Sequence, residues 1–252
     1  MKKIIVVVLS IAVLFCAGCG DDSSGTSKSV SDNIQIGDTI TFGEFEQDNN
    51  ESNGKEPVEW IVLSKTGDSL LVITKYGLET AADNDAYDFE RKDGGTGKQI
   101  SWDKHLFRED MNSTRFIDYM FSEEEQNKLL YFNIKADQNP EYDENPGEDT
   151  ADKIFLLSAT EVDKYFGTDS ETFKGSIECR KCQPTKFAED YTYAYLKEGN
   201  TSGCWFLRTT GDCYTNASFA YVDENGVINY KGWSTDCGGC MIRPAMWIEY
   251  DF

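Results

Sequence analysis

Residues 203–250 read GCWFLRTTGDCYTNASFAYVDENGVINYKGWSTDCGGCMIRPAMWIEY, and this stretch decides the fold. Short runs of aromatic and β-branched residues alternate in it with glycine-containing turns, a pattern typical of small antiparallel sheets. Two of the runs predict a hairpin across Asn225-Gly226, because this pair supplies the positive φ angles of a tight turn. The last run contains Pro244, which predicts an edge strand or a bulge.

The rest of the chain has the same mixed character. Aromatic residues make up 13% of the 252 residues, and aliphatic runs are short. These features favour an α+β domain with small antiparallel sheets, a few short helices and long loops over a helical bundle. The net charge of −21 would repel phosphate backbones, so we expect no nucleic-acid partner.

The N-terminus is typical of an export signal. Basic residues precede an apolar run that is shorter than a typical membrane span. The run ends in small residues before Cys19, and this ending resembles the bacterial lipoprotein signal. Cys16 departs from that motif, and secretion with cleavage near Ala17 is the alternative. We expect a signal peptide over residues 1–18, lipid on Cys19, and anchoring to the outer face of the cytoplasmic membrane.

Two further segments complete the predicted organisation. Residues 19–34 contain almost no apolar side chain, so they predict a flexible spacer between the membrane and the domain. Residues 35–252 show no internal boundary and predict a single domain. Within it, a hairpin is expected across the turn at residues 65–68. Capping boxes that begin at Ser122 and Ser158 predict two helices.

Catalytic motifs are hard to find in this sequence. His105 is the single histidine, and its charged neighbours predict a surface position. The acidic residues between 136 and 152 lack the spacing of a calcium loop, so we expect them to be solvated. No nucleophile elbow, zinc-protease motif or phosphate-binding loop is present. A pair of glycosidase carboxylates would be invisible among 45 acidic residues.

Cysteines give the sharpest chemical signal. Six of them follow Cys19: Cys179, Cys182, Cys204, Cys213, Cys237 and Cys240. An even count outside the cytoplasm favours three disulfides. The two CxxC pairs, Cys179/Cys182 and Cys237/Cys240, could instead hold a structural zinc ion with four thiolates. Free thiols and a redox or copper site are also compatible with this pattern, and no further cofactor is expected.

Tryptophan and arginine side chains provide the remaining candidates for ligand binding. Both types form contact platforms for sugars and peptides when they are exposed. The candidates are Trp205, Arg208, Trp233 and Arg243. We expect Trp233 to be exposed in a loop over residues 231–239. Trp205 and Trp247 occupy core-like strand positions, and Arg243 is placed to donate hydrogen bonds to nearby carbonyls.

An ordered set of segments carries a resemblance. PVEWIVL, SWDKHLFREDMNSTRFIDYMFSEEEQNKLL, KIFLLSATEVDKYF, CQPTKFAEDY, WFLRTTG, AYVDENGVIN and IRPAMWI resemble a family of bacterial surface proteins, common in Gram-positive anaerobes, that is described only as a domain of unknown function. Thr209-Thr210 stands where that family has Ser-Pro, and the cysteine-rich insertions also depart from it. The ending is similar to C-type-lectin-like folds, which the formylglycine-generating enzymes share. The resemblance implies this fold and no activity.

Three functions are compatible with these observations. The first is a lipid-anchored cell-surface protein whose domain binds a glycan or a protein without catalysis. The second, implied by the similarity to formylglycine-generating enzymes, is a thiol- or metal-dependent oxidase that uses the CxxC pairs. The third is an accessory subunit without a ligand pocket. The missing motifs favour the first function.

Overall fold

The protein is represented by a computed structural model. The structure describes residues 34–80, 100–168, 170, 172–190, 194–212, 218–235 and 238–250. The predicted signal peptide, the predicted lipidation site Cys19, most of the predicted spacer, Cys213 and Cys237 therefore lie outside the described residues. In the part that is described, no helix has both the length and the apolar character needed to cross a membrane.

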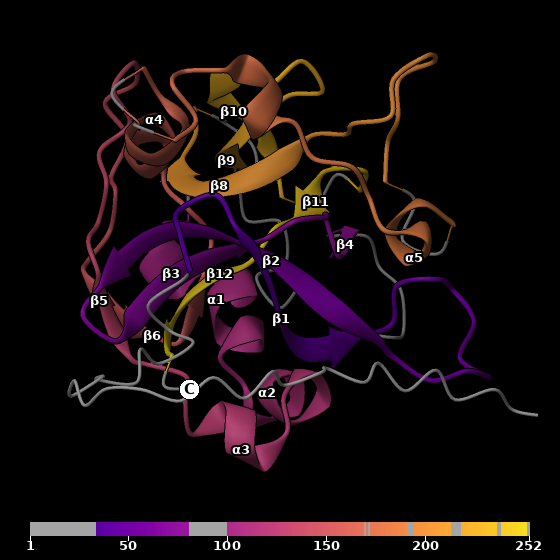
Figure 1. The fold of residues 1–252 in the computed structure, drawn as a ribbon. Coiled ribbons are helices and arrows are strands. Elements are labelled where there is room, and N and C mark those ends of the chain that lie inside the picture. The colour runs from indigo at the N-terminus through magenta and orange to yellow at the C-terminus, as the bar shows by residue number, and fades with distance from the viewer. Residues whose placement is uncertain are drawn as a thin grey trace, which may run out of the picture.

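The first sheet has five antiparallel strands in the order β1-β2-β3-β12-β7 (Figure 1). The strands are β1 (Thr39–Phe45), β2 (Glu56–Thr66), β3 (Ser69–Thr74), β12 (Ala245–Glu249) and β7 (Ile154–Phe155). Strands β2 and β3 form the hairpin that the sequence predicts, and Gly67 in its turn has a φ of 57°. The C-terminal strand thus lies between an early strand and a strand from the middle of the chain.

The second sheet has the order β10-β9-β8-β11-β4. Its strands are β10 (Ile228–Ser234), β9 (Ser218–Val222), β8 (Trp205–Thr210), β11 (Met241–Ile242) and β4 (Glu79–Thr80). The hairpin predicted across Asn225-Gly226 is confirmed as β9 and β10. Strand β11 runs parallel to β8 and pairs Met241 with Trp205. A small separate sheet pairs β5 (Phe132–Ile134) with β6 (Thr150–Asp152).

Pro244 joins the two larger sheets. The expected edge strand or bulge is wrong, because the chain leaves β11 in the second sheet and enters β12 inside the first. Proline cannot donate a ladder hydrogen bond, so it stands between two strands rather than within one. Its carbonyl oxygen accepts a hydrogen bond from Thr74 N at 3.0 Å.

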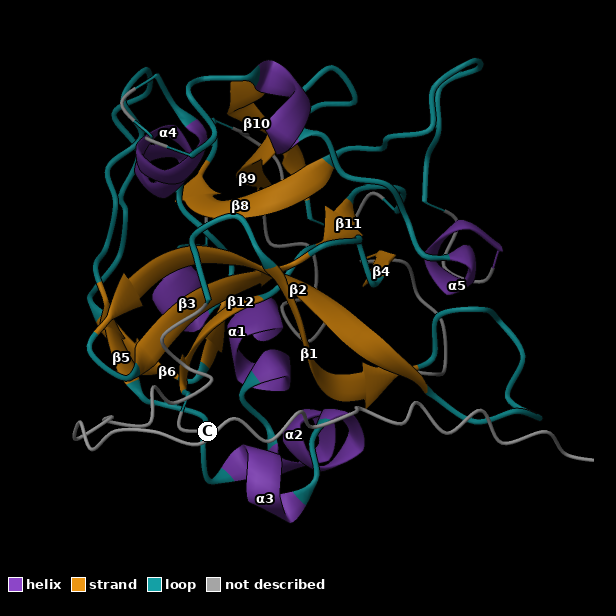
Figure 2. Cartoon of the chain, viewed as in Figure 1, coloured by secondary structure: helices purple, strands orange, loops and turns teal. Residues whose placement is uncertain are grey.

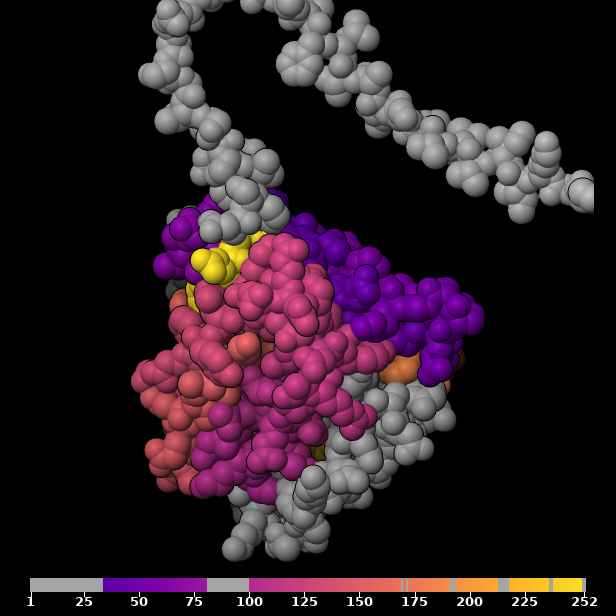
Figure 3. All heavy atoms as spheres, turned by 90° about the horizontal axis from the view of Figure 1, so that it is seen from below, coloured from indigo at the N-terminus to yellow at the C-terminus, as the bar shows by residue number. Residues whose placement is uncertain are grey.

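Short helices surround the sheets, as Figure 2 shows. They are α1 (Leu106–Met111), α2 (Thr114–Met120), α3 (Glu123–Gln126), α4 (Ala159–Phe166) and α5 (Lys186–Asp190), with the 3-10 helices η2 (Trp102–Lys104) and η3 (Ile177–Arg180). Both predicted capping boxes are present, at the start of α3 and of α4. The segment that contains α1–α3 covers much of the face seen in Figure 3. Sheets and a few helices confirm the expected α+β class.

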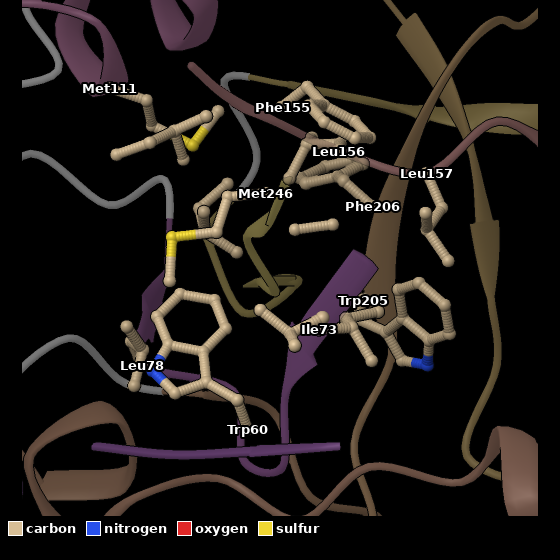
Figure 4. Close-up of a cluster of buried hydrophobic side chains, with 14 of the residues drawn as sticks. Trp60, Ile73, Leu78, Met111, Phe155, Leu156, Leu157, Trp205, Phe206 and Met246 are labelled. Atoms are coloured by element: carbon tan, nitrogen blue, oxygen red, sulfur yellow. The ribbon is translucent and has the colours of Figure 1, made fainter. Parts of the chain in front are cut away.

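The core lies between the sheets and helices and is rich in aromatic side chains (Figure 4). Trp60 of β2 and Trp205 of β8 are fully buried, so each larger sheet contributes one such indole. Both indoles keep their N–H groups satisfied: Trp60 donates to Phe42 O at 2.7 Å and Trp205 to Arg180 O at 2.9 Å. Burying a large aromatic side chain contributes roughly 2–3 kcal/mol, provided that the N–H has a partner.

The structure corrects one sequence prediction about polar residues in part and another in full. The acidic residues between 136 and 152 are exposed or half-buried as expected, except Asp152, whose side chain is 1% exposed. It accepts from Arg108 Nε at 2.8 Å and from Trp102 Nε1 at 2.9 Å, so it ties η2 and α1 to β6. His105, expected at the surface, is buried. Both side chains can be buried because specific hydrogen bonds satisfy them.

Candidate ligand-binding cleft

A cleft of about 590 Å³ opens where the two sheets meet the loops before β8. Its walls come from segments that are distant in the sequence. Lys75 and Tyr76 follow β3, Glu178 and Cys179 belong to η3, and residues 199–202 form the loop that leads to β8. Clefts that hold small organic ligands have volumes of about 300–1,000 Å³, and this one lies within that range.

Arg243 lies at the base of the cleft and is 1% exposed. Its Nε donates to Thr74 O at 2.9 Å. The guanidinium carbon lies 4.8 Å from the centre of the Trp205 ring and 6.0 Å from that of Phe166. Nη1 is buried without a hydrogen-bond partner, and no carboxylate among the described residues pairs with this cation. Burial lowers the pKa of Arg243, because the charged guanidinium loses its hydration there.

The charged groups at the rim are already paired. Lys75 Nζ lies 3.0 Å from a carboxylate oxygen of Glu59, and Lys181 Nζ lies 2.9 Å from one of Glu178. All four side chains are substantially exposed to solvent. Exposed ion pairs of this kind contribute only about 0–1 kcal/mol, so a ligand can rearrange them at little cost.

Uncharged polar groups line another part of the cleft. They are supplied by Gln183, Asn200, Thr201 and Ser202. Gln183 Nε2 donates to Thr201 Oγ1 at 3.4 Å, and this weak bond leaves hydrogen-bonding capacity for a ligand. Tyr76 and Phe173 add aromatic surface. None of these residues is predicted from the sequence, because they lie on loops that carry turn signals and no motif.

The four predicted ligand-binding residues are separated by the structure. Arg243 lines the cleft, and Trp205 packs against its guanidinium. Trp233 is half-buried in β10 rather than exposed in a loop, and its ring packs edge-on against Tyr221 at 5.6 Å. Arg208 lies outside the cleft lining, where it contacts Glu161 and donates to Leu156 O at 2.8 Å.

The described cysteines lie close to the cleft. Cys179 is half-buried in its wall, and Cys182 is buried nearby, with a thiol pKa that burial raises. Cys204 and Cys240 are buried next to one another where β8 and β11 pair. Burial, together with contact with Cys204, raises the pKa of the Cys240 thiol well above its usual value. High thiol pKa values make both Cys182 and Cys240 poor nucleophiles at neutral pH.

The proposed zinc ligands are only partly described. Cys237 lies outside the described residues, so a zinc ion on Cys179, Cys182, Cys237 and Cys240 stays a prediction. Within the described ranges, one group of three potential metal ligands has its atoms within 4.8 Å of one another: Glu46, Asp48 and Glu56. Backbone N–H groups of Asn50 and Gln47 already bond to Glu46 and Glu56 in this group.

His105 does not have the properties of a general base. Its Nδ1 accepts a hydrogen bond from Phe107 N at 3.1 Å and caps α1, so the ring proton resides on Nε2. Nε2 lies 3.1 Å from Thr235 Oγ1. Burial lowers the pKa of His105 to about 3. The imidazole is therefore neutral at physiological pH, and both of its nitrogens have structural partners.

Comparison with models of protein families identifies the family of this chain. A family model described as Domain of unknown function (DUF6273) matches residues 67–250, which is more than half of the sequence. The chain belongs to the DUF6273 family. The DUF6273 match begins in the turn between β2 and β3. Two strands of the first sheet, β1 and β2, therefore precede the matched residues. Searches of curated proteins and of solved structures found no match.

Proposed function

We propose that this DUF6273 protein is anchored by lipid on Cys19 to the outer face of the cell membrane, where its domain binds a glycan or protein ligand without catalysis. The leader and the polar spacer support the location. The cleft beneath the loops before β8 is the observation that carries the binding function. The domain is proposed to be C-type-lectin-like, since its last strand lies in the same sheet as its early strands.

Several features favour binding over catalysis. The cleft combines amide, hydroxyl and aromatic groups, which suit recognition of a polar organic molecule. Arg243, which lines the cleft, donates a hydrogen bond to a backbone carbonyl and lies against two aromatic rings. His105, the one histidine of the chain, is not among the residues that line the cleft. A pre-organised polar cleft of this kind loses little entropy when a ligand binds.

Blocking the cleft tests the binding function. Thr201 is exposed at the rim, so Thr201→Trp should fill the entrance without disturbing the core. Thr41→Trp, at an exposed position on β1 outside the lining, provides the matched control. The full chain is applied to arrays of bacterial glycans and of peptides. We expect the wild type and the control to retain a common set of ligands that Thr201→Trp loses. Equal retention by all three proteins would contradict a function located in the cleft.

Membrane anchoring has a separate test. Cys19→Ala removes the proposed lipid attachment site, so this variant should leave the membrane fraction while the wild type stays in it. A Cys19→Ala protein that remains firmly membrane-bound would contradict the lipid anchor. The ligand-binding proposal would be unaffected by that result.

The oxidase of the formylglycine-generating type is the second candidate. The contact between the Cys204 and Cys240 thiols supports it, because two neighbouring thiolates suit a soft metal ion such as Cu(I). Metal analysis and the intact mass of the full chain, before and after reduction, decide between the candidates. Stoichiometric copper would favour the oxidase. A metal-free chain whose mass increases on reduction would favour structural disulfides.

A further inference from the structure

We propose that the cleft recognises the carboxylate of a ligand through the buried guanidinium of Arg243. This inference rests on the proposed binding function and names the chemical group that the cleft binds. The observation behind it is a juxtaposition: a buried cation with an unpartnered Nη1 lies at the base of a cleft of about 590 Å³.

Arg243 has unused hydrogen-bonding capacity. A guanidinium carries five N–H donors in a planar fork, and a buried polar group without a partner destabilises a protein. In this structure Nε is occupied by Thr74 O, whereas Nη1 has no partner. A carboxylate matches the guanidinium fork with two parallel hydrogen bonds. A carboxylate bound in the cleft would supply the missing negative charge, and it would become the partner of Nη1 once the lining over that buried atom opens.

No internal counter-ion for Arg243 is found among the described residues. The group that interacts electrostatically with Arg243 is Cys182. Burial raises the pKa of that thiol, so it is uncharged at neutral pH. The rim carboxylates of Glu178 and Glu224 lie near Lys181 and Lys197, at 2.9 Å and 3.4 Å. Within the described ranges, no negatively charged group therefore compensates the charge of Arg243.

The charges around the cleft favour a single carboxylate over a phosphate. Glu178 and Glu224 line the cleft, and the whole chain has a net charge of −21. A second negative charge on the ligand would be repelled by these groups. Arg243 is one cation, and the two rim ion pairs, Lys75–Glu59 and Lys181–Glu178, add no net positive charge. The uncharged lining at residues 200–202 then fits the neutral polar body of a monocarboxylate.

Matched pairs of ligands test this proposal by isothermal titration calorimetry on the full chain. N-acetyl-alanyl-alanine is compared with its C-terminal amide, and methyl glucuronide with methyl glucoside. The first pair tests for recognition of a peptide C-terminus, and the second tests for recognition of an acidic sugar. Inorganic phosphate is the fifth probe. We expect at least one carboxylate to bind at least about ten-fold more tightly than its neutral counterpart, which corresponds to about 1.4 kcal/mol. Phosphate should bind more weakly than that carboxylate.

Two variants locate the interaction. Arg243→Met preserves the length and apolar contacts of the side chain and should abolish the preference for the carboxylate. Thr201→Trp blocks the cleft with Arg243 intact and should abolish binding of the same probe. Because this second variant leaves the core unchanged, the test holds even where Arg243→Met fails to fold.

Three results would overturn the inference. They are equal affinity for both members of each pair, tighter binding of phosphate than of any carboxylate, and no saturable binding of either carboxylate. The array experiment with Thr201→Trp is independent of these probes. A ligand that this variant loses and that Arg243→Met retains would leave the proposed function standing and would refute the role of Arg243.

Discussion

Two buried arginines occupy opposite electrostatic situations in this domain. Arg208 of β8 contacts Glu161, and its Nη1 also donates to Leu156 O at 2.8 Å. Arg243 follows β11 and has a backbone carbonyl and aromatic faces around it, but no carboxylate among the described residues. The hollow that Arg208 lines has a volume of about 10 Å³, whereas the cleft that Arg243 lines has a volume of about 590 Å³. Burial alone therefore does not reveal what an arginine does, and its partners are the better guide.

The largest effect is expected at Arg208. Arg208→Met leaves Glu161 with an unpaired carboxylate beside the core, and breaking a buried ion pair in this way costs about 3–5 kcal/mol. The side chain of Glu161 is 27% exposed, so we expect the lower end of that range. Chemical denaturation gives the change in unfolding free energy. The double variant Arg208→Met/Glu161→Gln should recover part of the loss, and a stability loss below about 1 kcal/mol in the single variant would contradict a structural role.

The strands beside the two arginines meet at Cys204 and Cys240, where a second effect is expected. The two residues directly precede the paired strands β8 and β11 and their thiols contact one another, an arrangement that favours a disulfide between them. Oxidation should link them and stabilise the domain by about 2–4 kcal/mol through loop closure. Peptide mapping without reductant identifies the pair, and denaturation with and without reductant measures the gain. A bond from Cys204 to Cys213 instead would contradict this pairing.

His105 extends the comparison to a base that is buried in its neutral form. Its pKa is lowered from 6.5 to about 3 in the folded state. The unfolded chain therefore binds more protons between these values, and the contribution of His105 to stability is present above pH 6.5 and is lost as the pH falls. In His105→Asn, asparagine can still cap α1 but does not titrate. The difference in unfolding free energy between this variant and the wild type should change by about 2 kcal/mol from about pH 7 to about pH 5.

A parallel denaturation series at both pH values checks this prediction. The control is Lys104→Ala, next to His105 in the sequence and exposed at the surface, which should show the same pH dependence as the wild type. A constant difference between His105→Asn and the wild type at both pH values would show that the imidazole does not resist protonation.

The sequence predicts correctly those structural elements that depend on residues close together in the chain. The capping boxes at Ser122 and Ser158 and the turn at Gly67 each depend on residues a few positions apart, and the structure contains all of them. Features that depend on distant partners are predicted poorly. The charged sequence neighbours of His105 indicate a surface position, yet the imidazole is buried against Thr235, which is 130 positions away.

The cleft is also predicted poorly from the sequence, because its residues come from distant parts of the chain. Arg243 is a candidate ligand residue from its type alone, but its hydrogen-bond partner Thr74 lies 169 positions away. The contribution of residues 199–202 cannot be predicted, because nothing in their local pattern indicates that they share a cleft with η3. Pro244 obeys the local rule that proline avoids the interior of central strands. The chain satisfies that rule with a break between β11 and β12, which places the following strand inside the first sheet.

The smallest effect on stability is expected at Arg243, where two contributions oppose each other. Arg243→Met removes the hydrogen bond to Thr74 O, and an unsatisfied buried carbonyl costs about 1–3 kcal/mol. The same change removes a buried cation that has no counter-ion among the described residues, and replacing buried charge with an apolar side chain is often neutral or stabilising. We therefore expect the unfolding free energy to change by less than about 1 kcal/mol, measured as for Arg208→Met. A loss as large as that of Arg208→Met would mean that Arg243 is structural, and the contrast between the two arginines would disappear.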